Sequence, residues 1–295
     1  MERLLFIYNQ YSGKGRIKDS LSDVIDTFVK ENYEVTVYAT QAQGDATRKV
    51  IEDGADFDRI VCSGGDGTLD EVITGVMKMG KRVPVGYLPA GSTNDFGNSL
   101  GIDKVIDDAA QIAAKGNLFP CDVGKFGDDF FVYVAAFGIF TETSYSTSQK
   151  LKNTLGYAAY FLEGIKQLNN VPKYHVKIDT GKEVIEDDFI FGMVTNSMSV
   201  GGMTEIVKGE VGLSDGLFEG CFVQSPKNMI ELNETLAFLS GLKKKESPHV
   251  YNFQSSSFKI ECDDEMPWTL DGEFGGNHGN IEIECCHEAI DILVE

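Results

Sequence analysis

A glycine-rich loop early in the chain places one carboxylate among residues suited to binding phosphate. The loop follows an apolar run, precedes an amphipathic pattern and reads Gly64-Gly65-Asp66-Gly67-Thr68. Glycines let a backbone approach phosphate closely, and the N-terminus of a following helix supplies free N–H groups. A bare carboxylate repels phosphate, so Asp66 is expected to act through a divalent cation. The alternative is a plain glycine turn whose aspartate faces water. The loop matches neither the dinucleotide fingerprint nor the P-loop.

A second pair of carboxylates, Asp271 and Glu273, occurs near the end of the chain in strand-like sequence. Residues two apart on a strand share a face, so the pattern predicts that both side chains point the same way. A carboxylate within hydrogen-bond reach of a hydroxyl can accept its proton during phosphoryl transfer. The alternative is a polar hairpin corner, because Gly275 and Gly276 follow.

Alternating strand and helix patterns in the first 120 residues are expected to position the glycine-rich loop. Thr68 and Glu71 have the spacing of a capping box, which predicts that Thr68 caps the helix after the loop. Strands separated by helices predict a mostly parallel sheet that binds ligands beyond the carboxyl ends of its strands. The expected strands are 4–9, 34–40, 59–62 and 83–88, with helices containing residues 21–28, 45–54 and 69–77.

Strand-like alternation dominates after about residue 123, interrupted by two expected helices over residues 155–168 and 227–242. The expected strands are 130–137, 173–179, 189–195, 217–223, 251–253, 258–262 and 281–285. We therefore expect an α/β plus β protein. A doubly wound α/β domain over residues 1–123 would be followed by a β-sandwich-like domain over 124–295, whose residues 288–295 can pack back on the first domain.

Composition excludes several classes of protein. The 295-residue chain has a net charge of −20, which repels nucleic acid, and its longest nearly apolar run is about half the length of a membrane helix. The six cysteines lack metal-type spacing, so buried thiols in a reducing cytoplasm are favoured over disulfides.

Lys243 to Lys245 are a candidate membrane contact, although lysines at a helix C-terminus also complement its dipole.

The motifs resemble those of a known family. Residues 64–72 are similar to the signature of the diacylglycerol kinase catalytic family, whose superfamily includes sphingosine kinases, NAD kinases and phosphofructokinases. Residues 91–96 resemble the family's G-T-x-N-D-F loop, with Ser92 in place of threonine. Residues 267–273 and 213–217 resemble the D-G-E segment and the D-D-G-L turn of bacterial lipid kinases. The matches occur in the family's order, so the chain is identified as a member.

The resemblance implies that the loops of the first domain hold ATP, with Lys14 near the phosphates unless it is simply a solvated lysine. The implied nucleotide-binding residues are Asn9, Ser12, Gly13, Lys14, Gly15, Thr40, Gly64, Gly65, Asp66, Gly67, Thr68, Thr93 and Asn94. Asp66, Asp95 and Asp122 match positions that organise water-bound Mg²⁺ in the family. Asp95 can instead cap the helix that follows it.

The resemblance also assigns roles in the second domain. Glu273 matches the catalytic base, and Asp271 is expected close to the metal and phosphates. The carboxylate of Asp215 and the carbonyls of Gly212 and Leu217 match a structural metal loop. Ser214 replaces an aspartate of that loop, so a simple Asp-Gly turn is the alternative.

The expected activity is an ATP- and Mg²⁺-dependent kinase that phosphorylates a hydroxyl of diacylglycerol or a related lipid. Such a protein would be cytoplasmic, would meet its lipid substrate at the inner face of the membrane, and would bind no nucleic acid. Neither the lipid nor the oligomeric state, for which a homodimer is one option, follows from the residues. The alternatives are a kinase for a soluble acceptor such as NAD, and a non-catalytic nucleotide- or lipid-binding module of the same fold.

Overall fold

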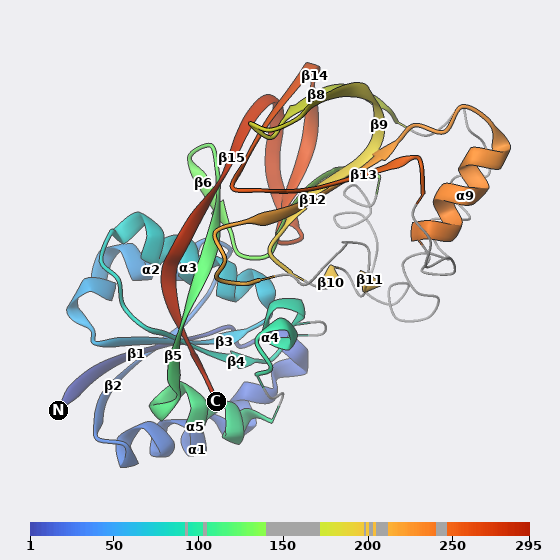
Figure 1. Cartoon of the computed structure of the whole chain (residues 1–295). Coiled ribbons are helices and arrows are strands. Elements are labelled where there is room, and N and C mark those ends of the chain that lie inside the picture. The colour runs from blue at the N-terminus through green and yellow to red at the C-terminus, as the bar shows by residue number, and fades with distance from the viewer. Residues whose placement is uncertain are drawn as a thin grey trace. The chain divides into compact units, whose positions relative to one another are not determined.

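The computed structural model describes residues 1–91, 94–102, 105–139, 172–197, 199–200, 203–204, 212–239 and 247–295. The chain divides into two compact units (Figure 1). The first comprises Met1–Val123 together with Cys286–Glu295, and the second comprises Gly124–Cys285. The chain passes from one unit to the other within two strands, β5 (Asn117–Phe126) and β15 (Glu273–Val294). The C-terminal end of the chain therefore belongs to the first unit.

The first unit contains a parallel sheet in the order β2-β1-β3-β4, completed by the C-terminal end of β15. Its strands are β1 (Glu2–Tyr8), β2 (Tyr33–Ala39), β3 (Arg59–Gly64) and β4 (Val85–Pro89). Ile292 of β15 pairs in parallel with Val85. The residues of β3 beyond Arg59 and all of β4 are buried, as expected for parallel strands covered on both faces.

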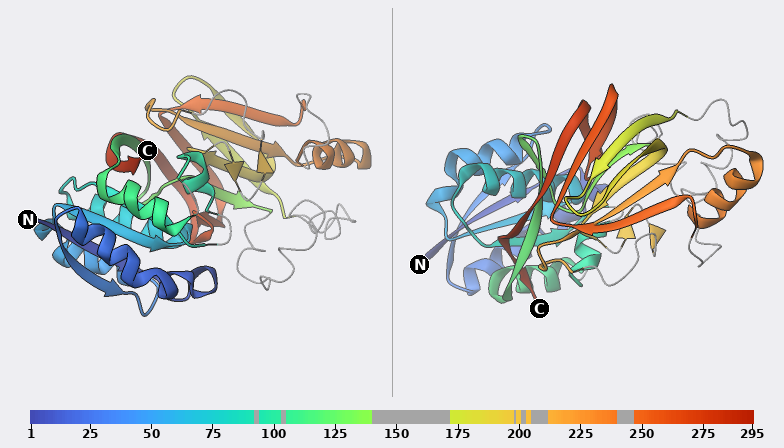
Figure 2. Two further views of the ribbon diagram at one scale, coloured as in Figure 1. Left: turned by 90° about the horizontal axis from the view of Figure 1, so that it is seen from below. Right: turned by 45° about the horizontal axis from the view of Figure 1, so that its top comes forward.

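Helices cover this sheet on two sides. Figure 1 shows α2 (Asp45–Asp53) and α3 (Asp66–Met79) on one side and α1 (Arg16–Lys30) and α5 (Ile106–Lys115) on the other. Seen from below in Figure 2, α1 and α5 face the viewer. The predicted helix face is confirmed in α1, where Val24 and Phe28 are fully buried. Short elements complete the unit: η1 (Ser12–Gly15), η2 (Gly54–Asp56) and α4 (Asp95–Ser99).

The second unit is built from antiparallel strands. The order is β13-β12-β9-β7-β14-β15, and β8 pairs with both β9 and β14. Since β7 also pairs with both β9 and β14, the four strands β7, β9, β8 and β14 form a closed ring of pairings. The core of the unit is rich in aromatic residues and includes Trp268. The strands are β6 (Asp129–Phe131), β7 (Val134–Gly138), β8 (Tyr174–Asp179), β9 (Val184–Thr195), β10 (Ser199–Val200), β11 (Met203–Thr204), β12 (Phe218–Gln224), β13 (Val250–Ser255) and β14 (Ser257–Leu270).

The structure differs from the predicted elements in one informative place. The strand expected over residues 130–137 is divided into β6 and β7, because Val132 and Tyr133 donate their N–H groups to a side chain. The helix expected over 227–242 is α9 (Met229–Leu239) in the described residues. The helix expected over 155–168, and the lysines at 243–245, lie outside the described residues.

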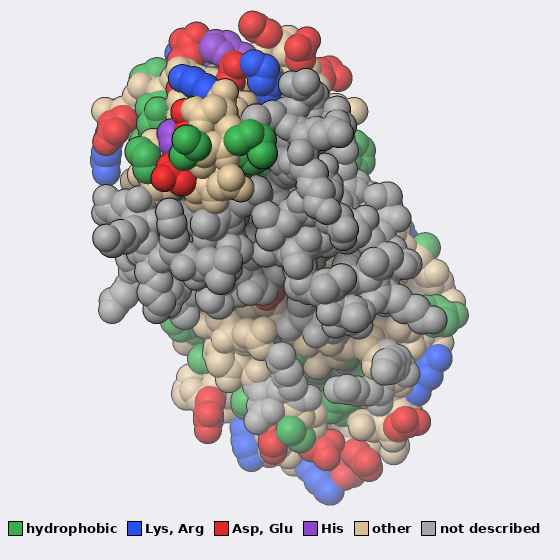
Figure 3. Space-filling view, turned by 90° about the vertical axis from the view of Figure 1, so that its right-hand side faces the viewer, with side chains coloured by type: hydrophobic (Ala, Val, Ile, Leu, Met, Phe, Trp, Pro, Cys, Tyr) green, Lys and Arg blue, Asp and Glu red, His purple; other side chains and the backbone are tan. Residues whose placement is uncertain are grey.

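Charges of both signs are interspersed on the visible described surface in Figure 3. Two exposed ion pairs of the second unit are Lys173, just before β8, with Asp188 on β9, and Lys177 on β8 with Glu261 on β14. The six cysteines are all free thiols. No helix among the described residues is long and apolar enough to cross a membrane.

Candidate active site

Three loops of the first unit meet at the carboxyl ends of β1, β3 and β4. An ideal Cβ on Gly13 would lie 1.6 Å from the carbonyl oxygen of Ala90, and one on Gly91 would lie 2.6 Å from Gly65 Cα. The Ala90 N–H also donates to the Gly64 carbonyl at 2.7 Å. The loops therefore contact one another through bare backbone, which is possible only because glycine occupies these positions.

The helices α1 and α3 begin at these loops with glycine as the N-cap residue. Gly15 is the N-cap of α1, with φ of 76°, and Gly65 is the N-cap of α3, so neither N-cap residue has a side chain that could cap its helix. The first N–H groups of an uncapped helix carry partial positive charge and attract anions. Since both helices begin beside the same loops, this edge of the sheet suits a phosphate chain.

The predicted capping box at Thr68 and Glu71 is wrong. The helix α3 already begins at Asp66, and the Thr68 N–H donates to the Gly65 carbonyl at 3.0 Å. The Glu71 carboxylate instead accepts the N–H groups of Gly44 and Ala46 at 2.8 and 3.0 Å. Glu71 thus stabilises the start of α2, a neighbour in space, because α2 and α3 pack side by side.

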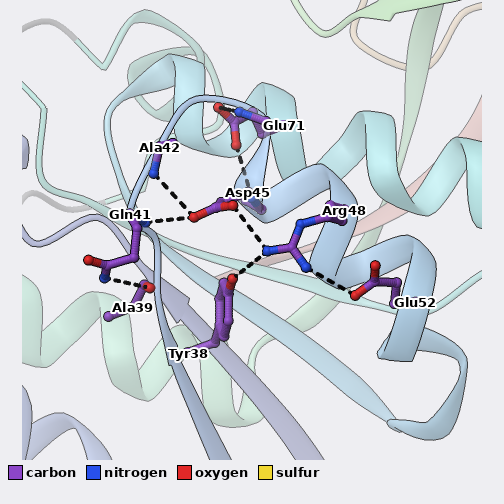
Figure 4. A network of polar contacts seen from close by, with 10 residues as sticks. Tyr38, Ala39, Gln41, Ala42, Asp45, Arg48, Glu52 and Glu71 are labelled. Carbon is purple, nitrogen blue, oxygen red and sulfur yellow. Dashed lines mark hydrogen bonds and ion pairs between the residues drawn. The ribbon is translucent and has the colours of Figure 1, made fainter.

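Figure 4 shows that the contact of Glu71 with α2 is part of a hydrogen-bond network around the loop between β2 and α2. Asp45 accepts the N–H groups of Gln41 and Ala42 at 2.8 and 3.1 Å and pairs with Arg48. These hydrogen bonds, the one from Gln41 above all, lower the pKa of Asp45. Thr40, a predicted nucleotide-binding residue, is buried at the beginning of this loop and donates its N–H to the Tyr8 carbonyl at 3.0 Å.

Asp66 occupies a partly enclosed position at the start of α3. Its carboxylate accepts the N–H groups of Asp95 at 3.2 Å and Phe96 at 3.4 Å, so it caps the short helix α4. Burial raises the pKa of Asp66, and these N–H donors act in the opposite direction. A nearby cation would favour the ionised carboxylate, so the environment of Asp66 is compatible with a metal ion.

Asn94 holds the second glycine-bearing loop in shape. Its Oδ1 accepts the Gly91 N–H at 2.9 Å and its Nδ2 donates to the Gly91 carbonyl at 3.1 Å. The buried Tyr87 hydroxyl contacts both Asn94 Oδ1 and the Gly64 carbonyl at 3.2 Å. Tyr87 was missed by the sequence reasoning because a tyrosine in a buried strand has no distinguishing pattern. The predicted ligand Thr93 and the side chain of Lys14 lie outside the described residues.

Asp122 is fully buried, and its contacts come from the returning C-terminal strand. Its Oδ1 accepts the backbone N–H of Glu288 at 2.6 Å and lies 2.9 Å from His287 Nδ1. Asp95 is buried as well, with 5% of its surface exposed. Within the described ranges, no three His, Cys, Asp or Glu side chains form a group that could bind a metal directly. A role for Asp66, Asp95 and Asp122 through metal-bound water therefore stays a prediction.

The D-G-E segment of the second unit is a hairpin turn, which corrects the expectation that Asp271 and Glu273 share a strand face. Leu270 at the end of β14 pairs with Glu273 at the start of β15, so Asp271 and Gly272 form a two-residue loop. Both loop residues have positive φ, 50° and 86°. Asp271 is buried and Glu273 is exposed. The alternative of a hairpin corner marked by Gly275 and Gly276 differs from this structure too, because the turn is at Asp271-Gly272, a pair that favours it, and both of those glycines lie in β15.

The loop before β12 has the geometry of an aspartate turn. Asp215 Oδ1 accepts the Leu217 N–H at 3.0 Å. An ideal Cβ on Gly212 would lie 2.6 Å from the other carboxylate oxygen of Asp215, so this carboxylate folds over the glycine. These contacts are those of an Asp-Gly turn, and binding of a cation by Gly212, Asp215 and Leu217 stays a prediction.

Comparisons with known proteins identify the family of the chain. Residues 3–126 match the model of the diacylglycerol kinase catalytic domain. The chain is 33% identical to a diacylglycerol kinase of Staphylococcus carnosus over 93% of this chain and 90% of that protein. It is 32% identical to a diacylglycerol kinase of Bacillus subtilis over 94% and 91% of the two chains.

Solved structures show the same mixed α/β fold. A crystal structure of a Bacillus anthracis protein proposed to be a diacylglycerol kinase aligns with a TM-score of 0.85 and 25% identity, covering 100% of this chain and 95% of that chain. A second crystal structure, of a diacylglycerol kinase from the same organism, aligns with a TM-score of 0.78 at 23% identity over 100% and 97%. The family expected from the motifs is confirmed: this chain belongs to the diacylglycerol kinase family.

Proposed function

We propose that this protein is an ATP- and Mg²⁺-dependent lipid kinase that transfers the γ-phosphoryl group to a hydroxyl of diacylglycerol or a related lipid. The observation that carries the proposal is the meeting of the Ser12–Gly15, Gly64–Gly65 and Ala90–Gly91 loops beside two helices whose N-cap residues are glycines. The lipid acceptor is inferred from the relatives, whose names identify them as diacylglycerol kinases.

The proposed ATP-binding part is the first unit, whose residues 1–123 would form a doubly wound α/β domain that residues 286–295 complete. Backbone amides at the starts of α1 and α3 would hold phosphate oxygens, together with Lys14. Thr40, Thr93 and Asn94 would border the nucleotide. Asp66, Asp95 and Asp122 would hold Mg²⁺ through water, and the contact between two of them supports this, because the Asp66 carboxylate accepts the Asp95 N–H at 3.2 Å. When bound, Mg²⁺ neutralises charge on the phosphates during transfer.

The second unit is the proposed acceptor domain, a set of antiparallel strands over residues 124–285. Glu273 is the proposed base, because it is an exposed carboxylate on a hairpin whose turn is tightly held. The hydroxyl oxygen of the lipid would attack the γ-phosphorus, and the bond from that phosphorus to ADP would break. The hydroxyl proton would pass to Glu273. The protein would act in the cytoplasm at the inner face of the membrane, and Gly212, Asp215 and Leu217 would hold a structural cation.

The test is transfer of labelled γ-phosphate from ATP to dispersed diacylglycerol, phosphatidylglycerol, undecaprenol, sphingosine and ceramide, with NAD as the soluble acceptor. Label in diacylglycerol that is lost with EDTA and restored by Mg²⁺ would support the proposal. Label in NAD alone would identify a kinase for a soluble acceptor. ATP binding without label in any acceptor would favour a binding module. Light scattering of the same preparation would measure whether the protein is a monomer or a homodimer.

A further inference from the structure

The carboxylate of Asp271 is enclosed by three successive backbone amides of the β6–β7 bend. Asp271 Oδ2 accepts the Val132 N–H at 2.6 Å, and Oδ1 accepts the N–H groups of Tyr133 and Val134 at 3.0 and 2.8 Å. Asp271 has only 4% of its surface exposed. Successive amides arranged in this way form a concave site for an anion, and here a side chain of the same unit fills it.

The backbone of Asp271 makes a further bond to the same bend. Its N–H donates to the Val134 carbonyl at 2.8 Å. Asp271 and Gly272 both have left-handed φ angles, which two-residue hairpin turns require and which are unfavourable for a residue with a side chain. An ideal Cβ on Gly272 would lie 3.9 Å from the Tyr133 hydroxyl, so the bend also packs against the turn. The bend therefore stabilises an otherwise unfavourable turn conformation.

Glu273 follows this turn directly. It pairs with Leu270 across the hairpin, and its side chain is exposed. The backbone of the turn that precedes Glu273 sets the position of its Cα and the direction of its Cα–Cβ bond. Displacing a catalytic group by about 1 Å can lower a rate by about 100-fold. The anchored turn thus fixes the backbone from which the Glu273 side chain extends.

We propose that Asp271 is a positioning residue: its carboxylate ties the β14–β15 turn to the β6–β7 bend and thereby directs Glu273 toward the acceptor hydroxyl. This inference depends on the proposed function and revises the expectation that Asp271 acts close to the metal and phosphates. Its two oxygens are engaged by backbone amides of its own unit, which is the arrangement of an anchor.

The kinetic test is Asp271→Asn in the wild type and in Glu273→Gln, with labelled ATP in single-turnover reactions. Asparagine keeps the oxygen that accepts from Tyr133 and Val134 but presents an NH₂ group to the Val132 N–H. For Asp271→Asn alone, we expect kcat to be about 10- to 100-fold lower than in the wild type. KM for ATP and the Mg²⁺ concentration for half-maximal rate should change less than about twofold. Glu273→Gln alone should lower kcat by about 10² to 10⁴.

The double variant distinguishes the anchor from an independent catalytic group. If Asp271 acts through Glu273, adding Asp271→Asn to Glu273→Gln should lower the rate by less than about twofold. A further loss as large as that in the wild type would overturn the proposal. A shift in the Mg²⁺ requirement of Asp271→Asn would overturn it too, because it would place Asp271 beside the metal. Asp263→Asn, an exposed change on β14, is the matched control and should leave all these values unchanged.

Hydrogen exchange tests the anchor without relying on catalysis. The amides of Val132, Tyr133 and Val134 should exchange at least about tenfold faster in Asp271→Asn than in the wild type or in Asp263→Asn. Unchanged exchange would overturn the proposal. A wild-type protein that phosphorylates no acceptor would instead refute the proposed function, and the exchange result would then report on the anchor alone.

Discussion

Gly13 and Ala90 contact each other through backbone atoms alone, although they belong to loops 77 positions apart in the sequence. The space that a Cβ on Gly13 would occupy is already filled by the Ala90 carbonyl oxygen, at 1.6 Å. Gly13 also has a left-handed φ of 54°. This contact holds the loop before α1 against the loop after β4, so it shapes the proposed phosphate site.

The first prediction is that Gly13→Ala disrupts this site. The new methyl group must push the two loops apart, so kcat/KM for ATP should fall by about 10- to 100-fold. Gly80→Ala is the control, because Gly80 has a similar φ of 73° but nothing within 4 Å. It should cost about 1 kcal/mol of stability without changing the kinetics. Equal kinetics in the two variants would show that the Gly13–Ala90 contact is unimportant.

The second prediction concerns Glu273. Glu273→Gln keeps the size of the side chain and removes its ability to accept a proton, so kcat for lipid phosphorylation should fall by about 10² to 10⁴. KM for ATP and the melting temperature should not change. Glu282→Gln on the same strand is the control, because its exposed pair with Lys259 contributes little. Full activity of Glu273→Gln would exclude this residue as the base.

The third prediction concerns the contact between α3 and α2. In Glu71→Gln, one of the two amides at the start of α2 loses its acceptor, so the free energy of unfolding should fall by about 1 kcal/mol. The Gly44 and Ala46 amides should lose protection from hydrogen exchange. Glu52→Gln, which removes only an exposed pair with Arg48, should change stability by less than about 0.5 kcal/mol. Equal losses in both variants would contradict a capping role for Glu71.

The fourth prediction is a pH dependence of stability that originates at Glu219. Burial, with a smaller contribution from the charge of Asp215, raises the pKa of Glu219 from 4.5 to about 7. The folded protein therefore holds this proton over a pH range in which the unfolded chain releases it. Stability attributable to Glu219 is greatest below pH 4.5 and falls as the pH rises toward 7, by up to about 3 kcal/mol in total.

Urea unfolding between pH 5 and pH 8 would measure this effect. Glu219→Gln removes the titrating group, so its stability should decline less over this range and exceed that of the wild type at pH 8. Glu261→Gln, an exposed change paired with Lys177, should keep the wild-type slope. A Glu219→Gln protein with the wild-type slope would show that another group is responsible.

Local sequence determined the elements and the loops that carry the chemistry. Helical spacing predicted α1, and the apolar runs predicted β1 and β3, because amphipathic and buried patterns depend on neighbours along the chain. The glycine-rich loop and the family were recognisable for the same reason. Glycine and aspartate in a fixed order describe a local backbone requirement that does not depend on the rest of the fold.

Tertiary structure alone decided which polar groups meet. Glu71 has the spacing of a capping box in its own helix, yet it caps α2, because the two helices pack together. Asp271 looks like one of two carboxylates on a strand, yet it fills a bend that lies 137–139 residues earlier in the chain. Hydrogen bonds between such distant residues depend on how strands and helices pack. The sequence pattern reports burial and turn preference at each position, but not which distant donor will lie within about 3 Å of a given acceptor.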